Sequence, residues 1–178
     1  MPLHIIIDTD PGQDDAVAIL LALAASDTFS IAAITAVCGN VVVDQTTANV
    51  LRICNLARRA DVPVHRGADR PLVFPLETAE FVCGTDGLAG ASLPSPSRAA
   101  TPGHAVDAII ACLRQAPADG VTLCALGPLT NIALAIRLAP DILPSISRIV
   151  MMGGAIGLGN MTPAAEFNMY VDPHAAAI

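Results

Sequence analysis

Apolar residues along the chain gather in short runs, and these runs alternate with longer stretches of mixed apolar and polar positions. Ile5-Ile6-Ile7 is a β-branched run typical of a strand buried on both faces of a sheet, and it stops at Asp8-Thr9-Asp10-Pro11-Gly12. Residues 14–25 are rich in Ala, Leu and Ile and begin with Asp14 and Asp15, where a helix dipole favours negative charge. This segment predicts a strand, a turn and a helix.

The same alternation recurs along the rest of the chain. It predicts further strands over residues 31–37, 62–65, 121–126 and 146–152, with Met151 and Met152 in the strand core, and helices over 44–59, 104–115 and 130–138, with Asp44 capping the first. Strands that alternate with helices in this way are typical of parallel βαβ units. We therefore expect one α/β domain over residues 1–178, with an open, mostly parallel sheet and helices on both faces.

Two stretches lack this periodicity. Residues 67–103 contain several prolines and a glycine-rich centre, and they are too long for a simple connection, so we predict a functional loop or lid. Residues 153–171 form the second irregular stretch. They end at Asp172-Pro173, a pair typical of an N-cap followed by proline at the first helical position, which predicts a last helix from residue 173.

The composition of the chain indicates which kinds of partner it can bind and in which compartment we expect it. The chain has no lysine, and its 9 basic residues against 16 acidic ones give a formal net charge of −7. Such a chain repels phosphate groups, so we expect neither nucleic acid nor an anionic membrane surface as a partner. The five cysteines form no Cys-x-x-Cys pair, and we expect them to be small buried hydrophobic residues of a protein in a reducing cytoplasm. The N-terminal segment predicts neither a signal peptide nor a membrane span.

Four carboxylates fall between positions 8 and 15, directly after the first predicted strand. Ligands of an open parallel sheet bind outside the carboxyl ends of its strands, where Asn40 and Leu126 are also expected. Two unit charges about 4 Å apart repel by roughly 4 kcal/mol at an effective dielectric near 20. Either raised pKa values or a bound cation would relieve this repulsion. Because the nearest basic residue in sequence is Arg52, a hard cation such as Ca²⁺ or Mg²⁺ is the simpler explanation.

Residues 8–16, Asp-Thr-Asp-Pro-Gly-Gln-Asp-Asp-Ala, closely resemble the N-terminal signature of the inosine-uridine preferring nucleoside hydrolases. Three further segments agree with that family in order and spacing: residues 37–41, residues 126–133, and residues 152–154 followed by 166–173. The resemblance implies a Rossmann-like nucleoside hydrolase fold. It also implies hydrolysis of ribonucleosides to free base and ribose, by a cytoplasmic homo-oligomer (dimer or tetramer) that serves nucleoside salvage.

The resemblance also implies a metal centre and a base. Asp10 would be a Ca²⁺ ligand and the general base that takes a proton from water, with Asp15 and the backbone carbonyl of Leu126 as further ligands. Asn40 would lie beside the ribose and the attacking water. Asp8 would support the carboxylates from behind.

The substrate contacts follow from the same resemblance. Asp14 and Asn168 would hold ribose hydroxyls, while Asn160 and Glu166 would reach the 5′ side of the sugar. Many family members have His where this chain has Cys83, which leaves the base preference, purine or pyrimidine, open.

Two alternatives remain at this point. The family pattern continues well beyond this length, and its later half brings another Asp ligand and a His near the leaving base, so the chain resembles an N-terminal portion that could be catalytically silent. We expect such a portion to leave apolar sheet and helix surface uncovered. Asp8-Thr9-Asp10 also resembles the nucleophile motif of haloacid dehalogenase-type phosphatases, in which the first Asp is phosphorylated. That motif calls for Thr or Val where Gly12 stands and for a downstream Lys, which this chain lacks.

Overall fold

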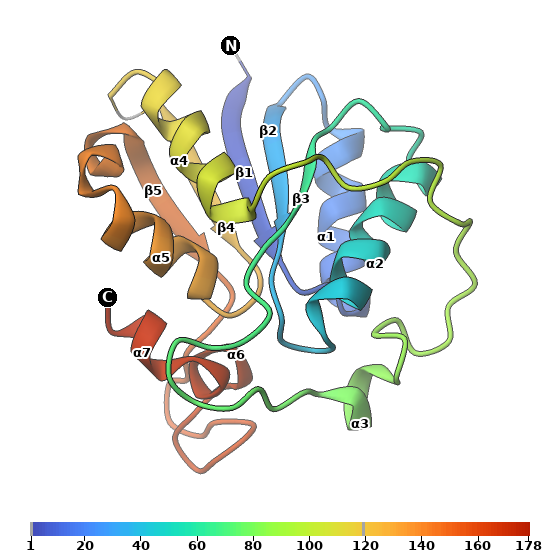
Figure 1. Cartoon of the computed structure of the whole chain (residues 1–178). Coiled ribbons are helices and arrows are strands. Elements are labelled where there is room, and N and C mark those ends of the chain that lie inside the picture. Colours follow the sequence, from blue (N-terminus) through green and yellow to red (C-terminus); the bar gives the residue numbers. More distant parts are fainter. Residues whose placement is uncertain (1, 119) are drawn as a thin grey trace.

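Five parallel strands form the centre of the molecule in a computed structural model that describes residues 2–118 and 120–178 (Figure 1). They are β1 (Leu3–Thr9), β2 (Phe29–Ala36), β3 (Val64–Arg66), β4 (Val121–Ala125) and β5 (Ile146–Met151). Their order in the sheet is β3-β2-β1-β4-β5, and each neighbouring pair is parallel. The expected open parallel sheet is therefore confirmed.

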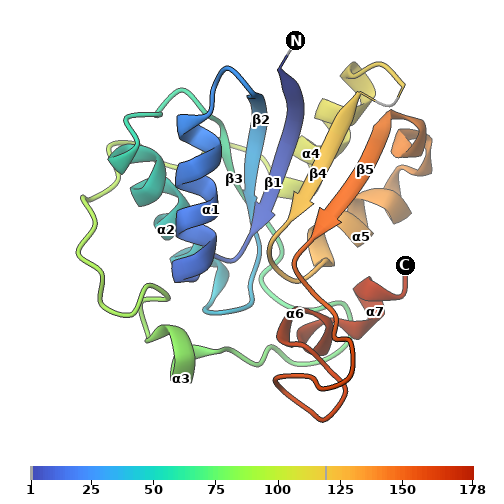
Figure 2. The same cartoon turned by 180° about the vertical axis from the view of Figure 1, so that it is seen from behind.

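Helices pack on both faces of the sheet, as expected (Figures 1 and 2). One face carries α1 (Gln13–Ala24) and α2 (Val43–Leu56), and the other carries α4 (Ala105–Gln115), α5 (Thr130–Leu138) and the 3-10 helix η1 (Pro140–Ser145). Alternate residues of β1 point to opposite faces, so Ile5 and Ile7 join the core beneath α1 and α2, while Ile6 joins the core beneath α4 and α5. The unbroken apolar run of β1 is explained by this burial on both sides.

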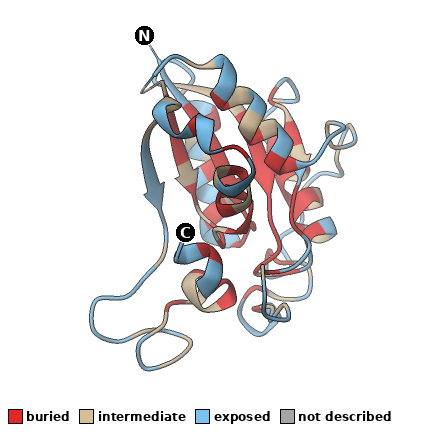
Figure 3. Cartoon of the chain, turned by 60° about the vertical axis from the view of Figure 1, so that its left-hand side comes forward, coloured by how far each residue is buried: buried red, intermediate tan, exposed pale blue. Residues whose placement is uncertain are grey.

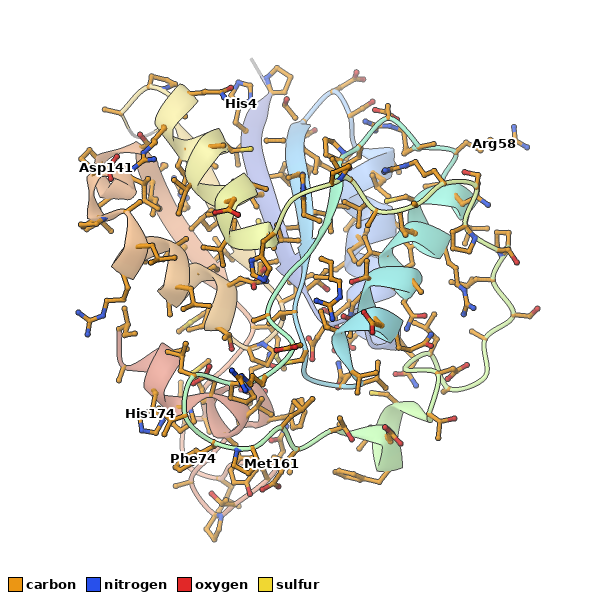
Figure 4. The ribbon with its side chains drawn as sticks, in the orientation of Figure 1. His4, Arg58, Phe74, Asp141, Met161 and His174 are labelled. Atoms are coloured by element: carbon orange, nitrogen blue, oxygen red, sulfur yellow. The ribbon has the colours of Figure 1, made fainter. Side chains whose placement is uncertain are left out.

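Three short helices lie beyond the carboxyl ends of the strands, at the bottom of the view in Figure 1. They are α3 (Glu80–Cys83), α6 (Phe167–Val171) and α7 (Pro173–Ala176). The Asp172 carboxylate accepts a hydrogen bond from the Ala175 N–H, and Pro173 occupies the first turn, so the predicted cap is confirmed. Phe74 and His174, which lie close together in Figure 4, pack edge to face with ring centroids 4.9 Å apart.

Several local expectations were wrong. Asp44 is not a helix cap, because α2 begins one residue earlier with Val42 at the N-cap, and Asp44 instead forms an ion pair with Arg66 at 2.6 Å. Helices α3 and α6 lie inside the two stretches that were expected to be irregular. Cys38, Cys54 and Cys83 are buried as expected, but the remaining two cysteines are only partly buried.

Among the described residues, no helix covers β4 and β5 on the side of the sheet opposite α4 and α5 (Figure 2). Met151 and Met152 are therefore about half exposed and not part of the core. Figure 3 shows β5, at one edge of the sheet, mostly in the colour of exposed residues, whereas the inner strands are mostly buried. The expected uncovered apolar surface is present. No helix among the described residues is long and apolar enough to cross a bilayer.

Candidate active site

A cavity of about 430 Å³ lies at the carboxyl end of the sheet. Every residue assigned from the sequence to catalysis, substrate binding or metal binding lines it: Asp10, Asp14, Asp15, Asn40, Leu126, Asn160, Glu166 and Asn168. The helix α3 contributes Phe81, Val82 and Cys83 to the wall, and Met161 lines the cavity from the loop at the lower edge of Figure 4. The tertiary fold thus brings segments that are more than 150 residues apart in the chain (Asp10 and Asn168) into one site.

Asp10 is held in one orientation at the base of this cavity. The Asn40 backbone N–H donates to its Oδ2 at 2.7 Å, and the Asn40 side-chain Nδ2 donates to its main-chain oxygen at 3.0 Å. A Cβ atom at Gly39 or Gly127 would collide with the carboxylate, so only glycine fits at either position. The other oxygen, Oδ1, is buried and meets no hydrogen-bond donor among the described residues. Oδ1 is therefore the oxygen of Asp10 that can bind a ligand or accept a proton.

Asp15 faces the same cavity from the first turn of α1. Thr9 Oγ1 donates to its Oδ1 at 2.7 Å and the Gly12 N–H donates to its Oδ2 at 3.2 Å, which fixes the turn between strand and helix. Asp14, the preceding residue, is exposed at the rim. The two neighbouring acids therefore occupy different environments, one buried against the turn and one open to solvent.

Asp8 is buried behind the cavity and does not line it. Thr35 Oγ1 and Asn131 Nδ2 both donate to its Oδ1, whereas its Oδ2 meets no donor among the described residues. With 1% of its surface exposed, Asp8 is out of reach of a phosphate ester. This burial argues against the phosphatase alternative, which requires Asp8 as the nucleophile.

Burial raises the pKa values of the three inner carboxyl groups, which are those of Asp8, Asp10 and Asp15. The pKa of Asp8 rises to about 7, against the opposing effect of its hydrogen bonds from Thr35 and Asn131. The pKa of Asp15 rises to about 6, also mainly through burial. Burial and the nearby charge of Asp15 hold the pKa of Asp10 well above its ordinary value. Near neutral pH these groups therefore favour either a proton or a cation.

The opposite wall of the cavity is organised by α6. The Glu166 carboxylate caps this helix by accepting from the N–H groups of Asn168 at 3.0 Å and Met169 at 3.3 Å, and it also accepts from the Gly154 N–H at 3.2 Å. Asn168 Nδ2 donates to the carbonyl oxygen of Leu126 at 2.8 Å. The Leu126 carbonyl keeps one lone pair free, since a carbonyl oxygen can accept twice.

The donor set of the cavity fits a hard divalent cation. The unpaired Oδ1 of Asp10, the carboxylate of Asp15 and the carbonyl of Leu126 are all oxygen ligands of the kind that Ca²⁺ prefers. Within residues 2–118 and 120–178, no group of three or more His, Cys, Asp and Glu side chains is arranged to hold a metal ion. These residues would thus supply part of a coordination shell.

Asn131 and Cys83 support the site through contacts that the sequence did not indicate. Asn131 lies in the segment 126–133 that carried the family resemblance, but nothing in its local pattern indicated that its amide reaches Asp8. Cys83 donates its S–H to Asn40 Oδ1 at 3.4 Å, so the residue that replaces His contacts the residue that orients Asp10.

Comparison with known proteins gives one consistent result. The sequence pattern of the inosine-uridine preferring nucleoside hydrolase family matches residues 5–178. An uncharacterised protein of Schizosaccharomyces pombe is 52% identical over 175 residues, which cover 98% of this chain and 56% of that protein. A pyrimidine-specific ribonucleoside hydrolase of Salmonella arizonae is 51% identical over 178 residues, which cover 100% of this chain and 57% of the relative.

Solved structures agree with these sequence matches. The plant nucleoside hydrolase PpNRh1 has a TM-score of 0.92 and 39% identity to this chain, and the match covers 99% of this chain and 56% of that structure. The chain therefore spans little more than half the length of the relatives it matches.

Proposed function

Because the chain belongs to the inosine-uridine preferring nucleoside hydrolase family, we propose that its cavity hydrolyses the N-glycosidic bond of ribonucleosides, giving free base and ribose. The observation that carries this proposal is the convergence of the family's motifs on one cavity, with the carboxylate of Asp10 held at its base. The same family membership supports a homo-oligomeric, cytoplasmic enzyme of nucleoside salvage.

Asp10 is the proposed general base. Its Oδ2 accepts a hydrogen bond from the Asn40 backbone N–H, so Oδ1 is the oxygen that takes a proton from the attacking water. Cleavage of an N-glycosidic bond passes through an oxocarbenium-like sugar. The carboxylate charge of the cavity that is left over, to which Asp14 and Asp15 contribute, stabilises this cationic transition state more than the neutral nucleoside, and this difference lowers the barrier.

Residues on the two walls of the cavity orient the ribose. Asp14 in the first turn of α1 and Asn168 on α6 hold the ribose hydroxyl groups. Asn160 and Glu166 face the 5′ side of the ribose. Because both oxygens of Glu166 accept backbone N–H groups, Glu166 also fixes the position of Asn168. Asp8 stays buried and keeps the strand end in place.

We further propose that Asp10, Asp15 and the Leu126 carbonyl hold Ca²⁺. When bound, this ion would neutralise the crowded carboxylates and make a nearby water easier to deprotonate. The raised pKa values of Asp10 and Asp15 support a site that prefers to be occupied by a positive charge.

The substitution Asp10→Asn tests the catalytic proposal. It preserves the size of the side chain but removes the base, so turnover should fall by about 10²-fold to 10⁴-fold. The assay follows the release of base and ribose from inosine and uridine in the presence of Ca²⁺. Asp27→Asn, at an exposed position after α1, is the matched control and should keep wild-type turnover.

Three outcomes would contradict the catalytic proposal. Wild-type turnover in Asp10→Asn would exclude Asp10 as the base. A folded wild-type chain that cleaves no ribonucleoside would favour the catalytically silent alternative. Release of phosphate from phosphate monoesters would favour the phosphatase.

Calcium binding can be tested without any activity. Ca²⁺ at about 100 times its Kd should stabilise the folded chain by about 2.7 kcal/mol, measured as a shift of the thermal midpoint. Asp15→Asn removes one carboxylate and should reduce this shift, whereas Asp27→Asn should leave it unchanged. An equal shift in Asp15→Asn and the wild type would place the ion elsewhere.

A further inference from the structure

Two walls of the active-site cavity come from distant parts of the chain. Ala79 and α3 form one of them, and Glu166 and α6 form the other. The segment of residues 72–77 leads from β3 towards α3 and passes beside α6 and α7 (Figures 1 and 2). We call this segment the bridging loop. Because it contacts one wall and continues into the other, its position determines how far apart the two walls lie.

Two contacts hold the first half of the bridging loop against α7. At the start of the loop, the Leu72 N–H donates to Oδ2 of Asp172, the residue that caps α7, at 3.0 Å. In the middle of the loop, the Phe74 ring packs edge to face on the ring of His174, with the ring centroids 4.9 Å apart (Figure 4). This half of the loop therefore cannot slide along α7 without losing a hydrogen bond and a ring contact.

A third contact lies where the bridging loop approaches α3. The Tyr170 hydroxyl group donates to Glu77 Oε2 at 3.0 Å. Tyr170 belongs to α6 and follows Asn168 by two residues, and Asn168 lines the cavity. Glu77 precedes Ala79 by two residues, and Ala79 also lines the cavity. The Ala79 N–H donates to the main-chain oxygen of Asn40 at 3.0 Å. The hydrogen bond between Tyr170 and Glu77 therefore connects the two walls.

We propose that Tyr170 and Glu77 are positioning residues, whose hydrogen bond fixes the separation of the two walls at which a ribonucleoside is held. This role rests on the proposed function of the cavity. Neither side chain lines the cavity, so Tyr170 acts through Asn168 on its own helix and Glu77 acts through Ala79 and α3. Loss of the bond frees one wall from the other and weakens substrate binding. The contacts of Asp10 stay in place, so the chemical step keeps its rate.

The composition of the chain makes this hydrogen bond directly observable. Tyr170 is the only tyrosine and the chain has no tryptophan, so an ultraviolet titration of the phenol reports Tyr170 alone. The hydrogen bond to Glu77, and then the charge of Glu77, raise the pKa of Tyr170. In Glu77→Ala we expect this pKa to fall towards its ordinary value. Glu80→Gln removes the same charge from an exposed position three residues further along, and it should leave the pKa of Tyr170 as in the wild type. Circular dichroism checks that the fold persists over the titration range.

Hydrogen exchange measures, without any substrate, whether the bond holds the walls together. The amides of Cys83 and Gly84 report on α3, because they donate to the main-chain oxygens of Ala79 and Glu80. In Glu77→Ala, exchange at both amides should become several-fold faster than in the wild type, because α3 is released from α6. The amides of β1 are the internal control. They lie in the centre of the sheet and should exchange as in the wild type.

Steady-state kinetics with inosine and uridine tests the effect on substrate binding. Tyr170→Phe keeps the ring and removes the hydroxyl group. Its KM should rise about two- to tenfold, the range that one hydrogen bond supplies, while kcat stays within about twofold of the wild type. The double variant with Glu77→Ala should have the same KM as Tyr170→Phe, because each single change already removes the bond. Glu80→Gln should keep both constants.

Four results would overturn the role of this hydrogen bond. They are an unchanged pKa of Tyr170 in Glu77→Ala, unchanged exchange at Cys83 and Gly84 in that variant, an unchanged KM in Tyr170→Phe, and additive effects on KM in the double variant. A wild-type chain that cleaves no ribonucleoside would instead overturn the proposed function. The titration and the exchange rates would then still decide whether the bond joins the two walls.

Discussion

At the scale of single residues, Asn131 shows how one side chain connects distant parts of the chain to the site. It is fully buried, and its Nδ2 donates to Asp8 Oδ1 at 2.8 Å and to the Ala36 carbonyl at 3.1 Å. Its Oδ1 accepts the Ala68 N–H at 2.9 Å. The amide therefore ties the carboxyl ends of β1 and β2 and the segment after β3 to the start of α5.

Asn131→Asp should destabilise the protein strongly. The change preserves shape, but it removes both N–H donors and places a carboxylate against the carboxyl group of Asp8, which should cost about 3 kcal/mol or more. Urea denaturation measures the loss. The control is Asn55→Asp, since the Asn55 amide donates to Ser95 O at an exposed site and its loss should cost about 1 kcal/mol or less. Similar losses for the two variants would contradict the proposed connecting role.

At the scale of secondary structure elements, the carboxyl edge of the sheet depends on short helices held by side chains. Asp172 caps α7, and its Oδ2 also accepts from Thr130 Oγ1 on α5 at 2.7 Å and from the Leu72 N–H at 3.0 Å. The loop before α3, the helix α5 and the helix α7 thus meet at one carboxylate. A four-residue helix such as α7 is too short to be stable alone, so these contacts hold it in place.

Asp172→Ala should loosen this junction. It removes a helix cap and leaves a buried hydroxyl and two N–H groups unsatisfied, so the free energy of unfolding should fall by roughly 2–3 kcal/mol. Hydrogen exchange at the Leu72 and Ala175 amides should become faster than in the wild type. Asp107→Ala, at an exposed first-turn position of α4, is the control. If exchange at Leu72 is unchanged in Asp172→Ala, the junction does not hold the loop.

At the scale of the whole molecule, the buried carboxyl groups determine how stability depends on pH. The pKa of Asp8 is about 7 in the folded chain and 3.8 in an exposed carboxyl group, so the folded state keeps a proton that the unfolded state has released. The resulting stabilisation is complete below the unfolded pKa. It is lost as the pH rises through the folded pKa, and it amounts to roughly 4 kcal/mol. The pKa of Asp10 is raised in the same direction.

We therefore expect the chain in EDTA to lose stability between pH 4.5 and about pH 7.5. Urea denaturation at several pH values gives this slope. Asp8→Asn should make the slope shallower, because Asn cannot titrate while Asp10 and Asp15 still do, and Asp27→Asn should leave the slope as in the wild type. Stability that stays constant or rises over this range would show that the inner carboxyl groups are ionised in the folded state.

The fold class and the location of the site could both be predicted from the order of residues along the chain. Runs of β-branched residues such as Ile5-Ile6-Ile7 indicate burial on both faces, and their alternation with helical segments is typical of a parallel sheet between two helix layers. Polar residues placed directly after those runs must then meet at the carboxyl edge. This reasoning located Asp10, Asp15 and Asn40, which share one cavity.

The differences between neighbouring residues with the same local pattern arise from tertiary packing. Asp8 lies near the end of β1 and Asp10 directly after it, yet Asp8 is enclosed by Thr35 from β2 and Asn131 from α5, while Asp10 opens to the cavity. Met151 has the pattern of a core strand residue but is exposed, because no element in the described part of the chain covers it. Burial and hydrogen bonding depend on which distant segments pack against a residue, and local sequence periodicity does not contain that information.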